Sequence, residues 1–439
     1  MKQLIYMVLL TGLGTMGALI NGPFWAVFVY YHFAVLRPQF LWKWSLPPDV
    51  AWSFYVAIVA LILTPIYQGA GSSSAQSGVS NRRWSSTHVW MFLYACWITL
   101  TYFTARVQDV AYPWLIENLK IFVMFFVASL VVKSVRAVWL LFVMTAFTLG
   151  YIAYEINFDY FVNHYMGIWL NGYGGYDNNG AGLMLAMGVP LCLFVWDGTY
   201  KWYRWLAAAM VPILMHAVMM TFSRGAMVSL LAASPFCWLF SRHRKQLAVT
   251  GILTILTLIP AMAGPEIRAR FFSIGEHEVD ESANSRKTSW AAAWRMALDN
   301  PITGVGIRNS NLFSHFYGGN QGQTTHNQYL QIAADSGLVA LGLYLALLLT
   351  VGVGLRRTRK LFQGREDEEG QQAQAIVSGI MCSGIVYCIG AVFLSLESFE
   401  LTYLLTLLGT QMVVIAQQPL IRSISFLQEE PNSVGWKTI

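Results

Sequence analysis

The chain has 439 residues, of which 56% are hydrophobic and only 11% are charged. Soluble globular proteins carry roughly 25% charged residues, so this composition excludes an ordinary soluble protein and favours one whose solvent is the lipid bilayer. The formal net charge of +6 comes from Lys and Arg residues scattered between apolar segments. Because they form no single basic stripe, the charge does not predict nucleic-acid binding.

Apolar segments recur along almost the whole chain, and a helix needs about 20 such residues to cross a hydrocarbon core of roughly 30 Å. We therefore predict an all-α polytopic membrane protein with about twelve transmembrane helices and one large periplasmic loop containing helices. The first segment is interpreted as an uncleaved helix, because no small-x-small cleavage site follows it. The segments are 4–20, 24–36, 52–67, 88–104, 115–132, 135–154, 181–196, 205–220, 226–240, 247–263, 329–355, 373–394 and 401–417.

Basic loops mark the cytoplasmic side of a membrane protein. The two densest clusters, 242–245 and 356–360, are predicted to lie inside, which sends 157–180, the Ser223-Arg224-Gly225 junction and 264–325 to the outer face. A helix is predicted over 289–298 within that last segment. The expected division has four parts: an N-terminal transmembrane bundle (1–180), central helices with the Ser-Arg-Gly motif (181–263), a large periplasmic loop (264–328), and C-terminal helices with a short cytoplasmic tail (329–439).

Arg224 follows Ser223 just before an apolar segment. A serine there can cap a helix, so that free backbone N–H groups and a guanidinium meet at one spot that suits a phosphate. The alternative is an interfacial arginine whose charge simply reaches the headgroup zone. Arg224 is a candidate diphosphate-binding residue, with both interpretations open.

Three more cations are expected near the same membrane level. Arg286 and Arg295 flank two tryptophans but stand nine residues apart, so they do not share one helix face, and one of them is expected to be structural. Lys120 follows Glu117 by three residues, which favours an internal ion pair over ligand binding. All three are candidates for binding a donor.

His326 lies where the large loop returns to an apolar segment. An imidazole can act as a general base near neutral pH, although a lone histidine is more often structural. Asp177, Asn178 and Asn179 precede another apolar segment on the same face, where capping a helix is the favoured interpretation. Together with Asn327, these side chains are candidates for binding an acceptor or a sugar.

The remaining motifs are negative. The five cysteines lie inside apolar segments without metal-ligand spacing, so no metal site is predicted. There is no Walker loop, no HExxH and no GxSxG, which argues against ATP-driven work. The acidic run at 276–281 is read as a solvated loop.

Four motifs follow one another between about 177 and 344: Ser223-Arg224-Gly225, Trp294-Arg295-Met296-Ala297 continuing through 299–306, His326-Asn327-Gln328-Tyr329-Leu330-Gln331 and Asp335-Ser336-Gly337. In this order they resemble the O-antigen ligase superfamily. The N-terminal stretch, with Gly22-Pro23-Phe24 and Arg37-Pro38-Gln39, is similar to the O-glycosylation ligases associated with exosortase systems.

The resemblance implies a membrane glycosyltransferase in the bacterial inner membrane, acting on its periplasmic face without nucleotide, cofactor or required metal. The donor would be an undecaprenyl-diphosphate-linked glycan, and the acceptor a hydroxyl of lipid A-core or a similar molecule. The resemblance assigns His326 as the general base and Arg224 and Arg286 as the groups that bind the diphosphate, with looser support for Lys120.

Three alternatives stay open. Within the same superfamily, the chain could be a polymerase of lipid-linked repeats or a protein O-oligosaccharyltransferase. From another class, a secondary transporter or flippase also has many helices with internal charges. Transport sites lie near the membrane midplane, whereas the candidates here collect on one face, which favours the ligase.

Overall fold

The computed structural model describes residues 1–47, 50–71, 84–246, 281–396 and 398–429. These residues are 80% helical, and no strand occurs among them. The prediction of an all-α fold is therefore confirmed. The helices are α1 (Lys2–Asn21), α2 (Phe24–Leu36), α3 (Pro38–Leu41), α4 (Trp52–Gly71), α5 (Ser86–Phe103), α6 (Gln108–Val131), α7 (Val135–Asn163), α8 (Gly167–Asn171), α9 (Asn178–Asp197), α10 (Tyr203–Met220), α11 (Arg224–Phe240), α15 (Glu281–Asp299), α16 (Ser310–Phe313), the 3-10 helix η4 (Ser314–Tyr317), α17 (Gln328–Phe362), α18 (Glu368–Gly390) and α19 (Glu400–Glu429).

Eight of the described helices are long and apolar enough to cross a membrane: α1, α4, α6, α7, α9, α10, α17 and α18. This count supports a polytopic membrane protein, while the prediction of about twelve spans stays a prediction. The apolar segment predicted at 247–263 lies outside the described residues, as does the acidic run up to 280. The four-part division of the chain likewise stays a prediction.

The centre of the bundle is α9, which packs against α7, α10, α11 and α18. Its side chains are buried on all faces, as expected of a helix that is apolar all round. Small residues let its neighbours approach closely. A Cβ on Gly182 would lie 2.6 Å from Oγ1 of Thr221, at the start of the turn into α11. The sequence of α9 thus fixes how near α11 can lie.

Helices α9 and α11 run in the same direction, with contacts at both ends. Near their N-termini α9 and α11 are joined by Asn178, whose amide donates to the Thr221 carbonyl at 2.9 Å. At their C-termini, Asp197 accepts from the backbone N–H of Arg242. The first residue of α17, Gln328, donates its backbone N–H to Ala391, just after α18 ends. We call the end of the bundle that holds the N-termini of α9, α11 and α17 the site end.

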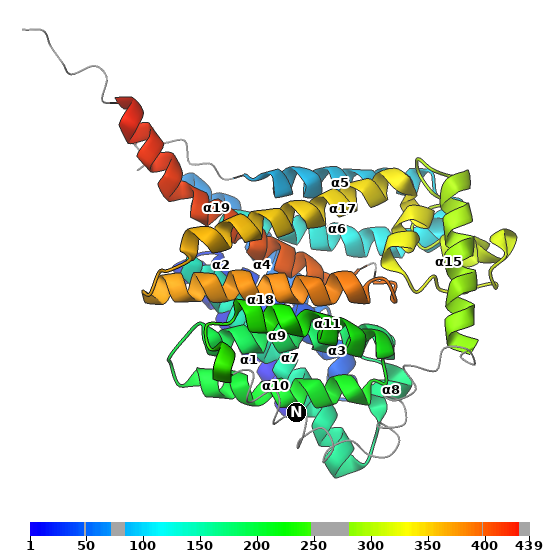
Figure 1. The fold of residues 1–439 in the computed structure, drawn as a ribbon, viewed down its shortest axis with the longest axis horizontal. Helices are drawn as coiled ribbons and strands as arrows, with labels where there is room; N and C mark the ends of the chain where they lie inside the picture. Colours follow the sequence, from blue (N-terminus) through cyan, green and yellow to red (C-terminus); the bar gives the residue numbers. More distant parts are fainter. Residues whose placement is uncertain (48–49, 72–83, 247–280, 397, 430–439) are drawn as a thin grey trace, which may run out of the picture.

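Helix α15 stands across the site end, beside the start of α17 (Figure 1). It confirms the helix predicted over 289–298 and is longer than predicted. The loop after it is paired to α17 through backbone hydrogen bonds: Val305 donates to Ala334 at 3.0 Å, Gly306 to Asp335 at 2.8 Å and Leu338 to Pro301 at 2.8 Å. These bonds are possible because α17 is kinked at Gly337, which has φ 85°.

Gly337 and Gly304 let the two backbones meet at that kink. A Cβ on Gly337 would lie 2.0 Å from the carbonyl oxygen of Ile302, and one on Gly304 would lie 2.4 Å from the backbone of Asp335. Both glycines also have positive φ, a conformation that only glycine adopts without strain. The glycines of this loop therefore serve close backbone approach to α17.

Candidate functional site

Three helix N-termini meet at the site end, and each is capped by a polar side chain. Asp177 accepts from Gly180 at 2.8 Å before α9, Ser223 from Ala226 at 3.3 Å before α11, and Asn327 from Leu330 at 3.0 Å before α17. The first-turn N–H groups of a helix carry a partial positive charge. Three such ends together create a region that favours an anion.

Arg224 is the first residue of α11 and is half-buried. Its position depends on the tight turn before it, in which Phe222 has φ 53° and the buried Ser223 caps the helix as predicted. Gly225 lies against Phe393, where an added Cβ would come within 3.1 Å of that side chain. The Ser-Arg-Gly motif therefore places a guanidinium at a helix N-terminus and packs the next residue against the chain between α18 and α19.

His326 and Arg286 come together although 40 positions separate them in the sequence. Burial and the neighbouring positive charge of Arg286 lower the pKa of His326 below its ordinary value of 6.5, while the negative charge of Asp177 acts in the opposite direction. The imidazole is therefore mainly neutral at pH 7 and able to accept a proton. Its residue has φ 51°, a left-handed conformation that costs energy for a non-glycine residue.

Helix α15 holds Arg286 beside this histidine through the residues around it. Ser289, one turn after Arg286, donates its hydroxyl to the carbonyl of Thr325 at 3.0 Å. Gln323 donates to the hydroxyl of Ser285 at 2.6 Å and to its carbonyl at 2.9 Å. The chain leading to His326 is thus bound along the first part of α15.

The three asparagine candidates use their side chains within the protein. Asn178 reaches the Thr221 carbonyl, Asn179 donates to Oδ1 of Asn178 at 3.2 Å, and Asn327 caps α17 from a buried position. Capping of α9 is done by Asp177, as the capping interpretation allowed, and Asn327 caps α17. The contact of Asn178 also ties the start of α9 to the turn before Arg224.

The described residues between α18 and α19, 391–396 and 398–399, contact α11, α17 and the start of α9 with the loop before it. Leu396 donates its backbone N–H to the Gln328 side chain, and Ser395 donates its hydroxyl to Gln331 at 3.1 Å. Ser398 accepts from the Tyr176 hydroxyl at 3.1 Å. No motif in these residues indicates this role in advance.

Arg37 is a site residue that was not among the predicted candidates. Its guanidinium lies 4.3 Å from the Tyr176 ring centroid and donates to the Tyr176 hydroxyl at 2.5 Å, to the carbonyl of Gly174, and to that of Ser398 at 3.4 Å. It therefore joins α2 to the loop before Asp177. Its charge, isolated between two apolar segments, was the available sequence signal.

Lys120 and Arg295 have partners away from His326. Lys120 pairs with Glu117 at 2.7 Å on the exposed face of α6, as the internal-pair interpretation predicts. Lys120 and Glu117 also interact electrostatically with Glu400, which accepts from the Tyr30 hydroxyl at 2.5 Å. The exposed Arg295 donates to the Tyr317 carbonyl at 3.1 Å and so holds the loop that follows α15. Donor binding by these two residues stays a prediction.

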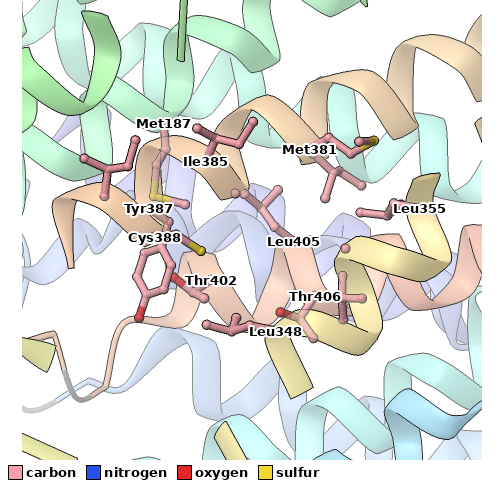
Figure 2. A pocket seen from close by; sticks show the side chains of 15 residues that line it. Met187, Leu348, Leu355, Met381, Ile385, Tyr387, Cys388, Thr402, Leu405 and Thr406 are labelled. Carbon is pink, nitrogen blue, oxygen red and sulfur yellow. The ribbon is translucent and has the colours of Figure 1, made fainter. Parts of the chain in front are cut away.

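An apolar cavity of about 290 Å³ lies between α17, α18 and α19, with Met187 of α9 at its wall (Figure 2). Cys388 lines this cavity, and its carbonyl accepts from the hydroxyl of Tyr329 at 2.9 Å. Tyr329 lies in the first turn of α17, three residues after His326. Among the described residues, no three His, Cys, Asp or Glu side chains gather in a way that could hold a metal ion.

Comparison with known proteins agrees with the sequence resemblance. Residues 208–345 match the family model described as O-Antigen ligase, a span that includes Arg224, Arg286, Arg295 and His326. No curated protein matches the chain. The family match implies a glycosyltransferase of the ligase or polymerase type in a multi-pass bacterial membrane protein, with a lipid-linked glycan donor and an acceptor in the membrane. The resemblance is therefore confirmed over residues 208–345, which are similar to the O-antigen ligase family.

Proposed function

We propose that this chain transfers a glycan from an undecaprenyl-diphosphate carrier to an acceptor hydroxyl, such as one on lipid A-core, at the periplasmic face of the inner membrane. The observation that carries the proposal is the meeting of a neutral histidine, His326, with Arg286 and Asp177 at the site end. A base beside a cation, next to helix N-termini, suits attack by a hydroxyl on a carbon whose leaving group is an anion.

The proposed reaction is a single displacement. Nε2 or Nδ1 of His326 takes the proton of the acceptor hydroxyl, whose oxygen forms a bond to the anomeric carbon. The bond from that carbon to the diphosphate oxygen breaks, and its electron pair leaves with the diphosphate. The configuration at the anomeric carbon inverts, and the imidazolium later gives its proton to water.

Arg224 and Arg286 are proposed to bind the diphosphate. Negative charge grows on this group as the bond to the sugar breaks, so fixed cations stabilise the transition state more than the ground state. Arg224 adds its guanidinium to the N–H groups of α11, and the N-termini of α9 and α17 act in the same direction. A guanidinium can contact two phosphate oxygens at once.

We assign the carrier's isoprenoid chain to the apolar cavity between α17, α18 and α19. The cavity is lined by aliphatic side chains such as Leu348 and Leu405, and Cys388 of its wall is hydrogen-bonded to Tyr329 in the first turn of α17. A diphosphate bound at the site end would therefore have an apolar space beside it for the units of chain nearest the headgroup. Burial of these methylene groups would add binding energy that does not depend on the sugar.

Reconstitution tests the assignment. The purified chain in proteoliposomes is given lipid-linked glycan and lipid A-core, and products are separated by mass. Glycan joined to lipid A-core supports the ligase; lengthened carrier-linked glycan without attachment would instead identify a polymerase. Movement of the donor across the bilayer without any new glycosidic bond would reject glycosyl transfer and favour a flippase.

A further inference from the structure

A polar pocket, distinct from the apolar cavity, lies at the end of the bundle opposite the site end. It has a volume of about 240 Å³ and lies between the C-termini of α9, α11 and α17 and the first turns of α18. Three guanidinium groups line it, those of Arg242, Arg244 and Arg359, together with one carboxylate, that of Asp197, and the polar side chains of Gln374 and Ser378. We call this the basic pocket. The chemistry proposed for His326 uses none of its residues.

Asp197 fixes the turn that carries two of these arginines. Its buried carboxylate accepts the backbone N–H of Arg242 at 3.1 and 3.2 Å and the hydroxyl of Ser241 at 3.2 Å. The Ser241 carbonyl in turn accepts from Nε of Arg244 at 3.3 Å. The carboxylate thus binds backbone and hydroxyl groups and forms no ion pair with the Arg242 side chain.

Arg359 enters the pocket from α17 and is held on two sides. Its guanidinium lies 4.3 Å from the Phe240 ring centroid, and its Nε donates to the Ser378 hydroxyl at 3.4 Å. It also interacts electrostatically with Arg244, a group of the same charge. Within the described part of the chain, no carboxylate forms an ion pair with Arg242, Arg244 or Arg359.

Like charges held together around a cavity favour an anion as ligand, because it would relieve their repulsion. The partial negative charge at a helix C-terminus stabilises one cation near each helix end, but it does not explain why three guanidiniums line one cavity. A guanidinium fork matches two phosphate oxygens, and the hydroxyl of Ser378 adds a further polar group. Basic pockets between membrane helices are a known arrangement for anionic lipid headgroups.

We propose that the basic pocket binds the phosphate of an anionic membrane phospholipid. The phosphate takes the place between Arg242, Arg244 and Arg359, and the acyl chains extend along the apolar surface of the bundle. Phe240 and the exposed Phe236 and Leu239 of α11 form such a surface beside the pocket. This site is separate from the transfer reaction and holds whether or not the chain is a ligase.

Native mass spectrometry of the purified full-length chain tests the proposal. The protein is titrated with phosphatidylglycerol or with phosphatidylcholine, and the lipid-bound fraction is measured. We expect phosphatidylglycerol to bind in preference, and R242Q, R244Q and R359Q each to weaken its binding roughly fivefold, the effect of one basic group near an anionic lipid. Arg357 lies on the same end of α17, is exposed and does not line the pocket, so R357Q is the matched control.

Three results would overturn the proposal. Equal binding of the two lipids would show that charge is not recognised, and equal loss in R357Q and R359Q would show that the pocket is not the site. Displacement of phosphatidylglycerol by the same concentration of inorganic phosphate would assign the pocket to a free anion. Because a substitution could disturb folding, the thermal midpoint of each variant in phosphatidylcholine is measured and must equal that of the unchanged chain.

Discussion

The Asn178 side chain donates to the carbonyl of Thr221 at 2.9 Å, which joins the first residue of α9 to the turn before Arg224. This hydrogen bond holds the stretch 177–179 at a fixed distance from the Ser-Arg-Gly motif, as the proposed reaction requires. We expect N178A to lower turnover roughly tenfold to a hundredfold, because small displacements of an oriented group cost about this much. The rate of glycan transfer measures it, and N179A, whose amide reaches only its neighbours, is the control.

His326 is expected to be essential as the base. H326A should lower kcat by about 10²–10⁴-fold, the usual contribution of general base catalysis, with little effect on the binding of the donor. Single-turnover transfer from purified lipid-linked donor separates these two quantities. Full activity in H326A would reject the assignment of this residue.

The pH dependence of glycan transfer follows from the burial of His326 and from the two charges beside it. Its pKa is lowered, so the base form persists below pH 6.5, and activity is expected to fall only at lower pH, where the ring is protonated. R286Q removes the charge that lowers this pKa and should move the acid limb of kcat to higher pH. D177N keeps a capping side chain but removes the charge that raises the pKa, and should move that limb to lower pH.

R286K is the matched control for this profile. It keeps the positive charge, so the acid limb should remain close to its original position, while turnover falls because lysine cannot contact two phosphate oxygens. An acid limb that is the same in R286Q, D177N and the unchanged chain would mean that His326 does not set the pH dependence.

The apolar cavity gives a prediction about the carrier. Gly384 lines the cavity and has no heavy atom within 4 Å of an added Cβ, so G384L should place its side chain in the space assigned to the isoprenoid chain. Loss of two buried methylene groups alone would raise KM for the donor about tenfold. Gly342 has equally open surroundings but does not line the cavity, so G342L should leave KM unchanged.

Arg37 is expected to matter for both folding and activity. R37K keeps the charge but loses the fork that reaches the Tyr176 hydroxyl and two carbonyl oxygens, and it also loses the planar contact with the tyrosine ring. We expect a stability loss of about 2 kcal/mol, as for a lost hydrogen bond to a charged group, and reduced transfer. H326A is the comparison variant, because it should lower transfer at an unchanged thermal midpoint. An unchanged thermal midpoint in R37K would contradict the structural role given to Arg37.

Local features of the site were predictable from the sequence because their causes are local. Apolar length predicts the membrane helices, and a serine before such a segment predicts the cap at Ser223, which the structure confirms. The pair of Lys120 with Glu117 follows from a spacing of three residues. Each of these interactions joins residues within one turn of helix.

Long-range features were not predictable in this way. Arg37 contacts Tyr176 and Ser398, more than a hundred and more than three hundred positions away, and nothing in its own neighbourhood indicates these partners. The residues 391–396 acquire their role only when the fold brings them against Gln328 and Gly225. The left-handed backbone of His326 depends likewise on α15 and α17 holding both sides of it.

The backbone pairing between the loop after α15 and the kink in α17 has a mechanical consequence. To swing α15 outward as a hinged lid, the chain would have to break the bonds of Val305, Gly306 and Leu338, at about 0.5–1.5 kcal/mol each. The glycines at the kink bring the two backbones into direct contact. These bonds therefore anchor the C-terminal end of α15 to the kink of α17.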